Sequence, residues 1–382
     1  SSQALEVRYV QGYRKDSSLI LYMSLQEGIG TKVFDISGYN NHGTLHGVKS
    51  WVSKGGLQFD GVNDYVEVDD NPSLNFGTDE DFSICFWMKA YPSADRAEAF
   101  VDKRTIGLGP KPGYSILTEH FNPNKIAVYI TDDNRNQVIL RSVTDVRDGR
   151  WHFIAVTFDR DGDGVLYVDA IEEDRKSIAK IGNISNSYNL CIGASANIAA
   201  FLNGTMSELR IYNRSLSKFE VTRLYLSRYE TPRADPHSTY VISGWVAPRN
   251  ASAQFFNLAG VKVYLNGTYT TSLDENGLFR FIFDLPSEVN NYTYRVTVEN
   301  MAKGGDAYVS VIVDRVVVFE VGAENAYIGQ EATAWFKLKS EFDDQPVETG
   351  IVVLSGGRNA TWNPEKSRWE YRETRNKVGI LS

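Results

Sequence analysis

Residues 149–170, "GRWHFIAVTFDRDGDGVLYVDA", fit two structures that imply different functions. Three aspartates alternate from Asp159 onwards and a glycine follows, as in the first half of a calcium-binding EF-hand loop. An EF-hand also needs a helix on each side and a glutamate at loop position twelve, where this chain has Ala170. Both flanks instead alternate with period two and are rich in aromatic and β-branched residues, which is typical of strands. We therefore predict a β-hairpin whose turn falls between Phe158 and Val165.

Short strand-like runs of the same kind recur along the chain. From residue 18 to 228 they are separated by Gly, Asp and Asn, a pattern that indicates an antiparallel sandwich or jelly roll. The chain contains 21 Tyr, 19 Phe and 7 Trp but 4 Met, and aromatic residues also favour strands. One helix is predicted within 215–229, where Ser217 and Glu220 have the spacing of a capping box. The fold class is therefore predicted to be all-β.

The charge and hydropathy of the chain exclude some partners. The net charge is −8 at pH 7, whereas nucleic-acid binding requires a basic face, so we expect no nucleic acid as partner. No apolar run approaches the ~20 residues that a membrane span needs, so no span is predicted in this segment. The chain starts at Ser1 without Met, and we interpret it as a piece of a larger protein.

Turn signals and composition divide the chain into successive segments. Two prolines and several charges without apolar periodicity mark a linker. In the unit that follows, Asn276-Gly277 predicts a hairpin turn, because glycine accepts a positive φ. The last unit is shorter than a sandwich of ~100 residues and is expected to be incomplete. The predicted segments are an N-terminal segment 1–15, a large domain 16–230, a linker 231–238, a second domain 239–314 and a third domain 315–382.

Five motifs follow one another in the large domain. They are "EGIGTKVFDISGYNNHGTLHG", "GGLQFDGVNDYVEV", "DFSICFWMKA", "GRWHFIAVTFDRDGDGVLYVDA" and "LNGTMSELRIYNRSLSKFEV". Together they resemble the laminin-G-like, concanavalin A-like jelly-roll family over about residues 16–230. The resemblance implies two stacked antiparallel sheets, one of them concave, with the first and last strands adjacent. Such modules usually bind carbohydrate or protein, and many hold a structural calcium ion.

The two later domains carry resemblances of their own. "AGVKVYLNGTYTTSLDENGLFRF" (259–281) and "YTYRVTV" (292–298) are similar to carboxypeptidase-regulatory-like and related immunoglobulin-like modules. "YIGQEATAWFKL" (327–338) and "ATWNPEKSRWEY" (360–371) resemble immunoglobulin-like repeats of prokaryotic, including archaeal, cell-surface proteins. The resemblances imply a concanavalin A-like jelly-roll sandwich followed by two smaller immunoglobulin-like β-sandwich domains.

A structural calcium ion is expected in the large domain. The stretch "FDISGYNNHG" (34–43) places carboxylate and amide oxygens in a glycine-containing loop, and calcium takes six to eight oxygen ligands. The alternative is that the carboxylate accepts backbone N–H bonds and so stiffens the turn. The family resemblance brings the first and last strands together, which adds a glutamate of the last strand. The candidate ligands are Asp35, Asn40 and Asn41 of the loop, then Glu208, and finally Asp64.

The cysteines and the glycosylation sequons bear on whether the protein is exported. Cys85 and Cys191 both lie in strand-like runs, which leaves open two buried thiols or one disulfide. We expect an exported protein to form the disulfide if the two Cα atoms lie within ~7 Å. Seven Asn-x-Ser/Thr sequons favour an exported glycoprotein. They are Asn183, Asn203, Asn213, Asn250, Asn266, Asn291 and Asn359.

The sequence lacks a catalytic constellation. Glu67 and Asp69 share a strand face, because side chains alternate with period two. Retaining glycosidases of this architecture carry a third carboxylate on that strand, at the position where this chain has Pro72. No Ser-His-Asp set, Cys-His pair or P-loop is present, so we predict that the chain is not an enzyme.

We predict a non-catalytic protein that is extracellular or lies on the cell surface. Its jelly roll would serve adhesion or carbohydrate recognition, with a glycan or a surface protein as ligand and the later domains as spacers. One alternative is a structural subunit of a surface layer, filament or stalk. Another is the accessory part of a large secreted hydrolase. The open sheet edge expected in the third domain also predicts strand exchange or self-assembly there.

Overall fold

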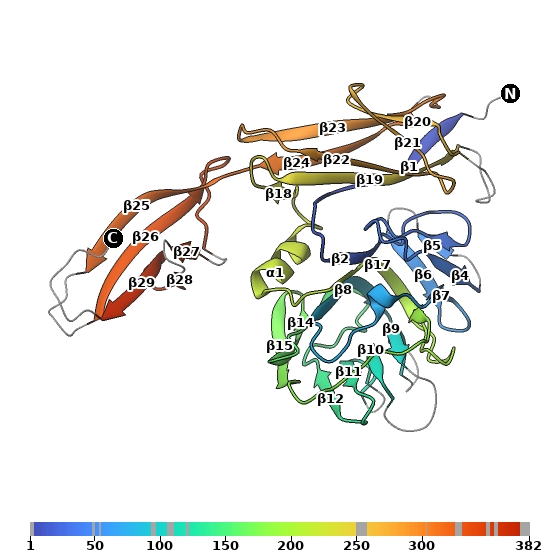
Figure 1. Cartoon of the computed structure of the whole chain (residues 1–382), viewed down its shortest axis with the longest axis horizontal. Coiled ribbons are helices and arrows are strands. Elements are labelled where there is room, and N and C mark those ends of the chain that lie inside the picture. The colour runs from blue at the N-terminus through green and yellow to red at the C-terminus, as the bar shows by residue number, and fades with distance from the viewer. Residues whose placement is uncertain are drawn as a thin grey trace.

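The computed structural model describes residues 4–47, 50–52, 55–92, 97–104, 111–119, 122–249, 258–302, 304–324, 331–348, 352–354 and 358–374. The chain is nearly all β, which confirms the predicted fold class. Figure 1 shows three units: a large sandwich, a smaller sandwich that lies over it, and a sheet that extends to one side. We call them the large, second and third units.

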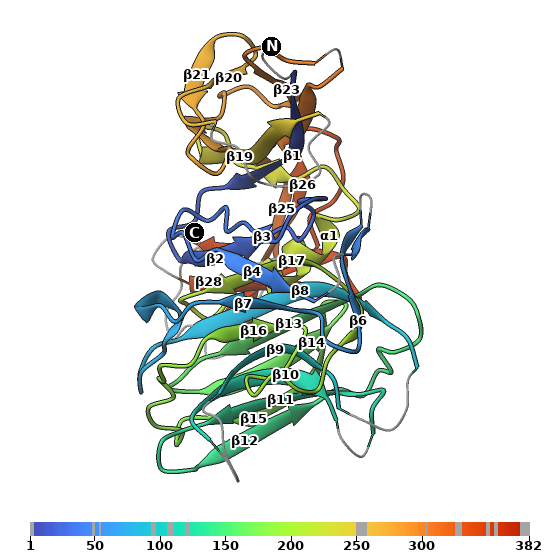
Figure 2. The same ribbon diagram turned by 90° about the vertical axis from the view of Figure 1, so that its right-hand side faces the viewer.

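The large unit consists of two sheets, which we call the front and back sheets. The front sheet contains β3 (Lys32–Val33), β4 (Gly43–His46), β7 (Tyr65–Val68), β9 (Ala99–Arg104), β10 (Gly113–Thr118), β11 (Ile126–Thr131), β12 (Gln137–Arg141) and β16 (Leu190–Ile192). The back sheet contains β2 (Leu19–Met23), β5 (Ser50–Val52), β6 (Gly56–Asp60), β8 (Phe82–Ala90), β13 (His152–Phe158), β14 (Asp163–Val168), β15 (Ile171–Ser177) and β17 (Asn203–Tyr212). The strand orders are β12-β11-β10-β9-β16-β7-β4-β3 in front and β15-β14-β13-β8-β17-β6-β5 behind, where β2 also pairs with β17. Figure 2 shows β8, β13, β9, β10, β11 and β12 running across the view one above another.

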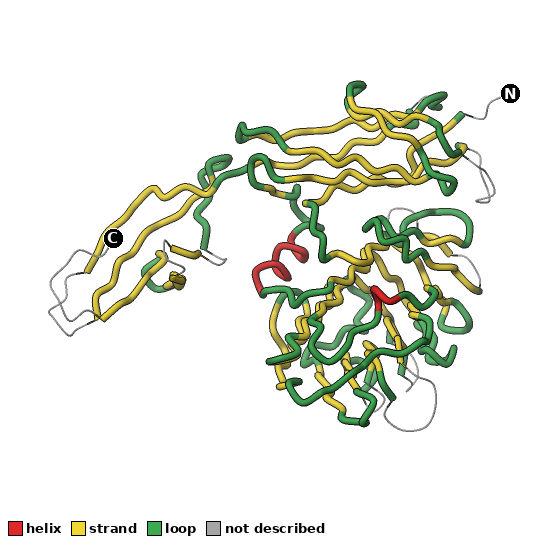
Figure 3. Tube along the Cα trace, viewed as in Figure 1, coloured by secondary structure: helices red, strands yellow, loops and turns green. Residues whose placement is uncertain are grey.

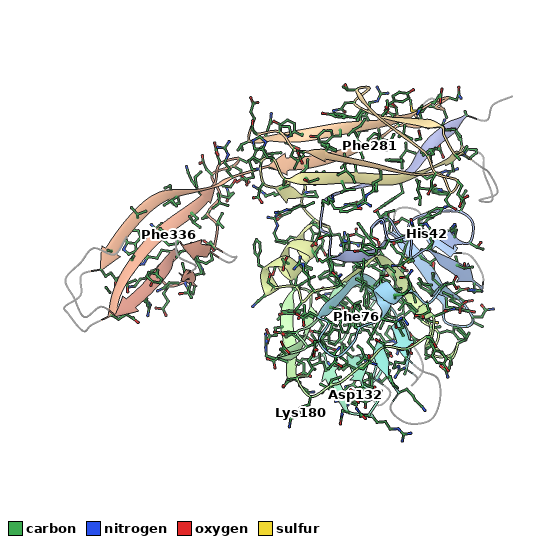
Figure 4. All side chains as sticks on the ribbon, viewed as in Figure 1. His42, Phe76, Asp132, Lys180, Phe281 and Phe336 are labelled. Atoms are coloured by element: carbon green, nitrogen blue, oxygen red, sulfur yellow. The ribbon has the colours of Figure 1, made fainter. Side chains whose placement is uncertain are left out.

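The predicted hairpin is confirmed. Strands β13 and β14 pair antiparallel with Phe158 opposite Gly164, so strands rather than EF-hand helices flank the aspartate-rich turn. Along β13, Ile154 and Val156 enter the core between the sheets, while Phe153 belongs to a second buried cluster on the outer face. Among the described residues, 40 are buried in the core between the sheets, and Phe76 marks its interior in Figure 4. The back sheet is therefore covered on both faces.

A single α-helix of the described chain covers part of the back sheet. Helix α1 (Lys218–Leu226) starts with the predicted capping box, in which Ser217 and Glu220 bond each other's backbone N–H. Its Val221 joins the outer cluster, and Tyr225 stacks on Trp87 with ring centroids 5.5 Å apart. Figure 3 shows this helix in red at the side of the large unit. No helix of the described residues is long and apolar enough to cross a membrane.

The second unit includes the start of the chain. Strand β1 (Leu5–Arg14) pairs antiparallel with β19 (Thr239–Pro248), which pairs with β22 (Leu278–Asp284). The sequence set residues 1–15 apart from the domains, whereas the structure builds Leu5–Arg14 of this segment into the second unit. The reason lies in the two faces of β1: Leu5 packs in the core of the second unit, and Tyr13 packs against the large unit. The large unit is thus inserted between two neighbouring strands.

The predicted linker 231–238 is also part of the second unit. Its strand β18 (Arg233–Ala234) pairs in parallel with β24 (Ala307–Val313). The sheet continues through β23 (Asn290–Val298), β20 (Lys262–Leu265) and β21 (Tyr269–Ser272). Because β21 and β22 belong to different sheets, the predicted turn at Asn276-Gly277 connects two sheets instead of closing a paired hairpin. Gly277 has the expected positive φ of 82°.

The third unit forms one sheet in the residues that the structure describes. Its strands are β25 (Val316–Glu324), β26 (Glu331–Ser340), β27 (Val352–Leu354), β28 (Arg358–Asn363) and β29 (Arg368–Thr374), in the order β25-β26-β29-β28-β27. The immunoglobulin-like assignment of the second and third units stays a prediction. Arg233 joins the third unit to the second, because it pairs with Asp314 at 2.7 Å and also with Asp343.

Of the two alternatives that the sequence left open for the cysteines, the structure shows two buried thiols and not the disulfide. Cys85 and Cys191 are free and buried. Cys85 belongs to the cluster on the outer face of the back sheet, whereas Cys191 lies opposite Glu67 and Asp102 on the outer face of the front sheet. The whole core of the sandwich separates the two thiols. Burial raises the pKa of each thiol to about 12.

Candidate functional site

The outer face of the front sheet presents a row of polar and aromatic side chains. Residues directly opposite each other on antiparallel strands share a face. One row that crosses the sheet is fully apolar and lies in the core: Leu45, Val66, Ile192, Val101, Ile116, Val128 and Leu140. The neighbouring row therefore points outward, and it consists of Thr44, Glu67, Cys191, Asp102, Ser115, Tyr129 and Ile139. We call this second set the outer-face row.

One end of the outer-face row combines aromatic rings with a carboxylate. The His46 and Tyr65 rings stack with centroids 4.5 Å apart and an angle of 9° between their planes. His46 Nε2 lies 3.3 Å from Glu67 Oε2, and Asn189 Nδ2 donates to Glu67 Oε1 at 3.0 Å. The Phe201 ring flanks the Tyr65 ring, and their centroids are 6.3 Å apart. All five side chains are half-buried, so they are accessible and yet held by their neighbours.

The centre of the row holds an ion pair between Arg104 and Asp102 with further contacts around it. Arg104 donates two hydrogen bonds of 2.8 Å to the two carboxylate oxygens of Asp102. The backbone N–H of Ala196 donates to the same carboxylate at 3.1 Å. The Arg104 guanidinium also lies over the Tyr129 ring, 5.7 Å from its centroid. Beside this network Cys191 stays a thiol at neutral pH, because burial raises its pKa to about 12.

This arrangement is suited to binding rather than to nucleophilic catalysis. Ring faces cover the apolar side of a sugar ring, and carboxylate and amide groups pair with its hydroxyls. Glu67 is engaged by Asn189 and lies beside His46, and Cys191 has no thiolate character. Sequence reasoning singled out Glu67 but missed Tyr65 and Asn189. The alternation of "DYVEV" indicated the face of Tyr65, whereas no sequence signal placed Asn189 beside it.

The structure brings two of the predicted calcium ligands together. Asp35 is buried, and its carboxylate accepts hydrogen bonds from the backbone N–H groups of Tyr22, Ser37 and Asn41 and from the Ser37 hydroxyl, at 2.9–3.0 Å. These four bonds occupy the lone pairs of the carboxylate, which is the turn-stiffening alternative. Asn41 Oδ1 is buried without a partner and is the oxygen left for a cation. This donor set falls short of the six to eight oxygens that calcium takes, so no function is assigned to the ion.

The other predicted ligands make contacts of their own. Asp64 is buried and accepts a hydrogen bond from the backbone N–H of Asp60 at 3.0 Å. Glu208 pairs with Arg210 at 2.9 Å and has a positive φ of 54°. Among the described residues no group of three or more His, Cys, Asp or Glu side chains is placed to hold a metal ion. Calcium binding stays a prediction.

The predicted glycosylation sites differ in accessibility. Asn213, Asn266 and Asn291 are exposed, whereas Asn183 and Asn203 are half-buried. Asn359 lies on β28, and Asn250 falls outside the described residues. Attachment of sugar to any of them stays a prediction.

Comparison with known proteins gives a family match within the large unit. Residues 60–222 match the family described as the concanavalin A-like lectin/glucanases superfamily, which confirms the predicted resemblance for this part of the chain. The match includes Tyr65, Glu67, Asn189 and Phe201 of the site.

Relatives in sequence are bacterial toxins. The chain is 23% identical to botulinum neurotoxin type E of Clostridium botulinum over 96% of this chain and 29% of the toxin. It is also 23% identical to the botulinum-like toxin eBoNT/J of Enterococcus sp. (strain 3G1_DIV0629), over 52% of this chain and 16% of the toxin. The chain therefore spans less than a third of the length of these relatives.

Solved structures with similarity to the chain include toxin binding domains. The binding domain of Paraclostridial Mosquitocidal Protein 1 has 14% identity and a TM-score of 0.47, and the alignment covers 92% of this chain and 91% of that one. The receptor binding domain of botulinum neurotoxin D has 13% identity and a TM-score of 0.46, with coverages of 94% and 98%.

Proposed function

We propose that this chain is the non-catalytic, receptor-recognising part of a secreted toxin-like protein, and that its large unit binds a glycan on a target cell surface. The observation that carries the proposal is the stacked pair of His46 and Tyr65 beside Glu67 and Asn189 on an accessible sheet face. The match of residues 60–222 to a lectin-containing superfamily supports a sugar as ligand. The similarity to botulinum neurotoxin type E along 96% of the chain supports a toxin context.

Binding would use the ring faces and the polar groups together. A sugar ring stacked against Tyr65 and Phe201 buries apolar C–H surface, which contributes through the hydrophobic effect. Asn189 and Glu67 already hydrogen-bond each other, so their orientation is fixed before the ligand arrives. A preorganised pair loses little conformational entropy on binding. The protein's role is therefore recognition, with no bond made or broken.

A glycan array probed with the whole chain tests this proposal. We expect binding to a defined set of glycans, and we expect Tyr65→Ala to weaken it about tenfold or more, because a stacking face is removed. Tyr308→Ala is the matched control, since Tyr308 is an exposed tyrosine on β24 of the second unit. Equal losses for the two variants, or an array without specific binding, would reject the surface around Tyr65 and Glu67 as a glycan site.

A structural role is the second candidate, and the edge of the third unit favours it. Edge strand β25 pairs with β26 on one side, and its exposed residues include Val318, Phe319 and Val321. An open apolar edge of this kind pairs readily with another strand, so it could mediate the predicted self-assembly. Light scattering against protein concentration tests this role. Assembly that Val321→Lys abolishes would support it, and a monomer at all concentrations would exclude it.

A further inference from the structure

A cavity of about 250 Å³ lies between the large and second units. Its floor is the face of the β1-β19-β22 sheet that turns toward the large unit. Along β22, Phe279 and Phe281 point into the core of the second unit, so Arg280 between them points toward the large unit. The loop that holds Gly38 and Asn40 forms one wall, and Thr271, Ser272 and Asp274 form another. We call this cavity the inter-unit cleft.

The inter-unit cleft is held open by contacts around it. Phe34 of the large unit packs on Trp245 of the second with ring centroids 5.4 Å apart. Lys32 Nζ donates to Asn276 Oδ1 at 2.6 Å, and the Tyr13 hydroxyl donates to the Ile36 carbonyl at 2.6 Å. In Figure 4 His42 marks this junction of the two units. A fixed junction gives the cleft a lasting shape.

Arg280 is the unusual group of the cleft. Within the described residues it forms no ion pair, and its Nε is buried without a hydrogen-bond partner. A Cβ added to Gly38 would lie 1.8 Å from Arg280 Nη1, so the guanidinium fills the space that a side chain would take. Gly38 also has a φ of +104°, which other residues rarely adopt.

The two carboxylates that line the cleft are engaged elsewhere. The Asp35 carboxylate accepts four hydrogen bonds from its own loop and from β2. Asp274 Oδ1 accepts from the backbone N–H groups of Asn276 and Leu278 at 2.8 and 2.9 Å, which shapes the turn before β22. Arg280 is thus a guanidinium beside acids that already have donors. Such a group binds a carboxylate with two parallel hydrogen bonds.

We propose that the inter-unit cleft binds a monocarboxylated sugar, with the sugar carboxylate on Arg280. The hydroxyl of Thr271, the amide of Asn40 and the second carboxylate oxygen of Asp274 line the remainder and match sugar hydroxyls. The volume is slightly below the ~300–1,000 Å³ of pockets for drug-sized ligands, which suits one sugar ring. The negative charges of Asp35 and Asp274 would repel a second carboxylate, so the expected ligand carries one carboxylate. This site lies outside the outer-face row and does not depend on it.

Calorimetric titration of the whole chain with D-glucuronate and with D-glucose tests the proposal. The two sugars differ in one group, which is a carboxylate in glucuronate and a hydroxymethyl in glucose. We expect saturable binding of glucuronate and binding of glucose that is about tenfold weaker or more, because a charged hydrogen-bonded pair is missing. N-acetylalanine, which carries a carboxylate without a sugar ring, should bind as weakly as glucose.

Variants assign the binding to the cleft. Arg280→Gln should weaken glucuronate binding about tenfold or more, and Gly38→Ala should do the same by displacing the guanidinium. Arg295→Gln is the matched control, because Arg295 of the second unit pairs with Asp306 at the surface. Melting temperatures check that each variant is folded. Wild-type affinity in Arg280→Gln, or the absence of saturable glucuronate binding, would overturn the proposal.

Discussion

The large and third units are both built from antiparallel strands, yet they differ greatly in what holds them together. In the part of the chain that the structure describes, the large unit encloses 40 buried core residues between two sheets. The main cluster of the third unit has three, Leu338, Ala360 and Trp369, on one described sheet. Stability grows with the surface that folding buries, so it is concentrated in the large unit. The proposed binding surfaces both involve that unit, where side chains are held most firmly.

The largest expected effect comes from the aromatic core of the large unit. Phe82 is fully buried and stacks between Phe76 at 4.1 Å and Phe158 at 4.2 Å. Phe82→Ala should lower the free energy of unfolding of the large unit by about 3–5 kcal/mol, measured by denaturant titration. Phe336→Ala in the third unit is the matched control and should cost much less, because Phe336 is only half-buried. Equal losses would mean that the two units do not differ as described.

The next-largest effect on stability is expected from the buried ammonium group of Lys103. Lys103 Nζ donates to Asp70 Oδ1, Asn75 Oδ1 and the carbonyls of Asn186 and Tyr188 at 2.8–3.0 Å, and its side chain is fully buried. Lys103→Met removes one donor from each of these four oxygens and should cost about 2–3 kcal/mol in a denaturant titration. Lys366→Met breaks an exposed pair with Glu324 in the third unit and should cause no resolvable change. A Lys103 variant as stable as the wild type would contradict this account.

The stability of the large unit should also depend on pH near neutrality. His152 lies between Asp169 at 2.8 Å and Asp148 at 3.2 Å, and the hydrogen bond to Asp169 raises its pKa above the ordinary value of 6.5. A raised pKa means that the stabilisation is full below about pH 6.5 and is lost as the pH rises through the folded-state pKa. The melting temperature of the large unit should therefore fall as the pH rises from 6 to 8. His152→Gln should flatten this dependence.

The third unit provides the contrast for that experiment. Its Glu370 accepts a hydrogen bond from Arg372, which lowers the pKa of Glu370 to about 2. A lowered pKa stabilises the fold above the ordinary value of 4.5, and this stabilisation is lost as the pH falls toward about 2. Unfolding of the third unit should thus be insensitive to pH between 6 and 8. A transition of the third unit that shifts as much as that of the large unit would contradict the assignment to His152.

The smallest effect is expected from calcium at Asp35. The carboxylate already accepts four hydrogen bonds, so an ion would gain little there and should raise the melting temperature of the large unit only slightly. Melting in calcium and in excess chelator measures the effect, and Asp35→Asn should abolish a true calcium shift. Identical melting curves would leave Asp35 with its turn-stiffening role.

Local sequence patterns predicted much of the fold. The hairpin around residues 158–165 follows from period-two alternation on both flanks, and the helix start follows from the capping box of Ser217 and Glu220. The face of Tyr65 and Glu67 is likewise a local property of β7. Such features depend on neighbours in the chain, so a single sequence predicts them.

Non-local pairings could not be predicted in the same way. Alternation shows that β1 has two faces, but it does not show that β19, beyond the whole large unit, is its partner. The two cysteines lie in similar strand-like runs, yet their thiols point to opposite outer faces of the sandwich. Which groups lie next to the Arg280 guanidinium depends on the loop of Gly38, which belongs to another unit.

The sequence by itself determined the strand content, the turns and the helix cap of the large unit, because these follow from side-chain periodicity and backbone preference over a few residues. The concanavalin A-like resemblance came from the five ordered motifs of the large unit. Tertiary structure decided which strands pair, which faces are covered, and which polar groups face one another across the inter-unit cleft. These outcomes depend on how sheets of matching shape pack together, and packing sums many small contacts between residues far apart in the chain.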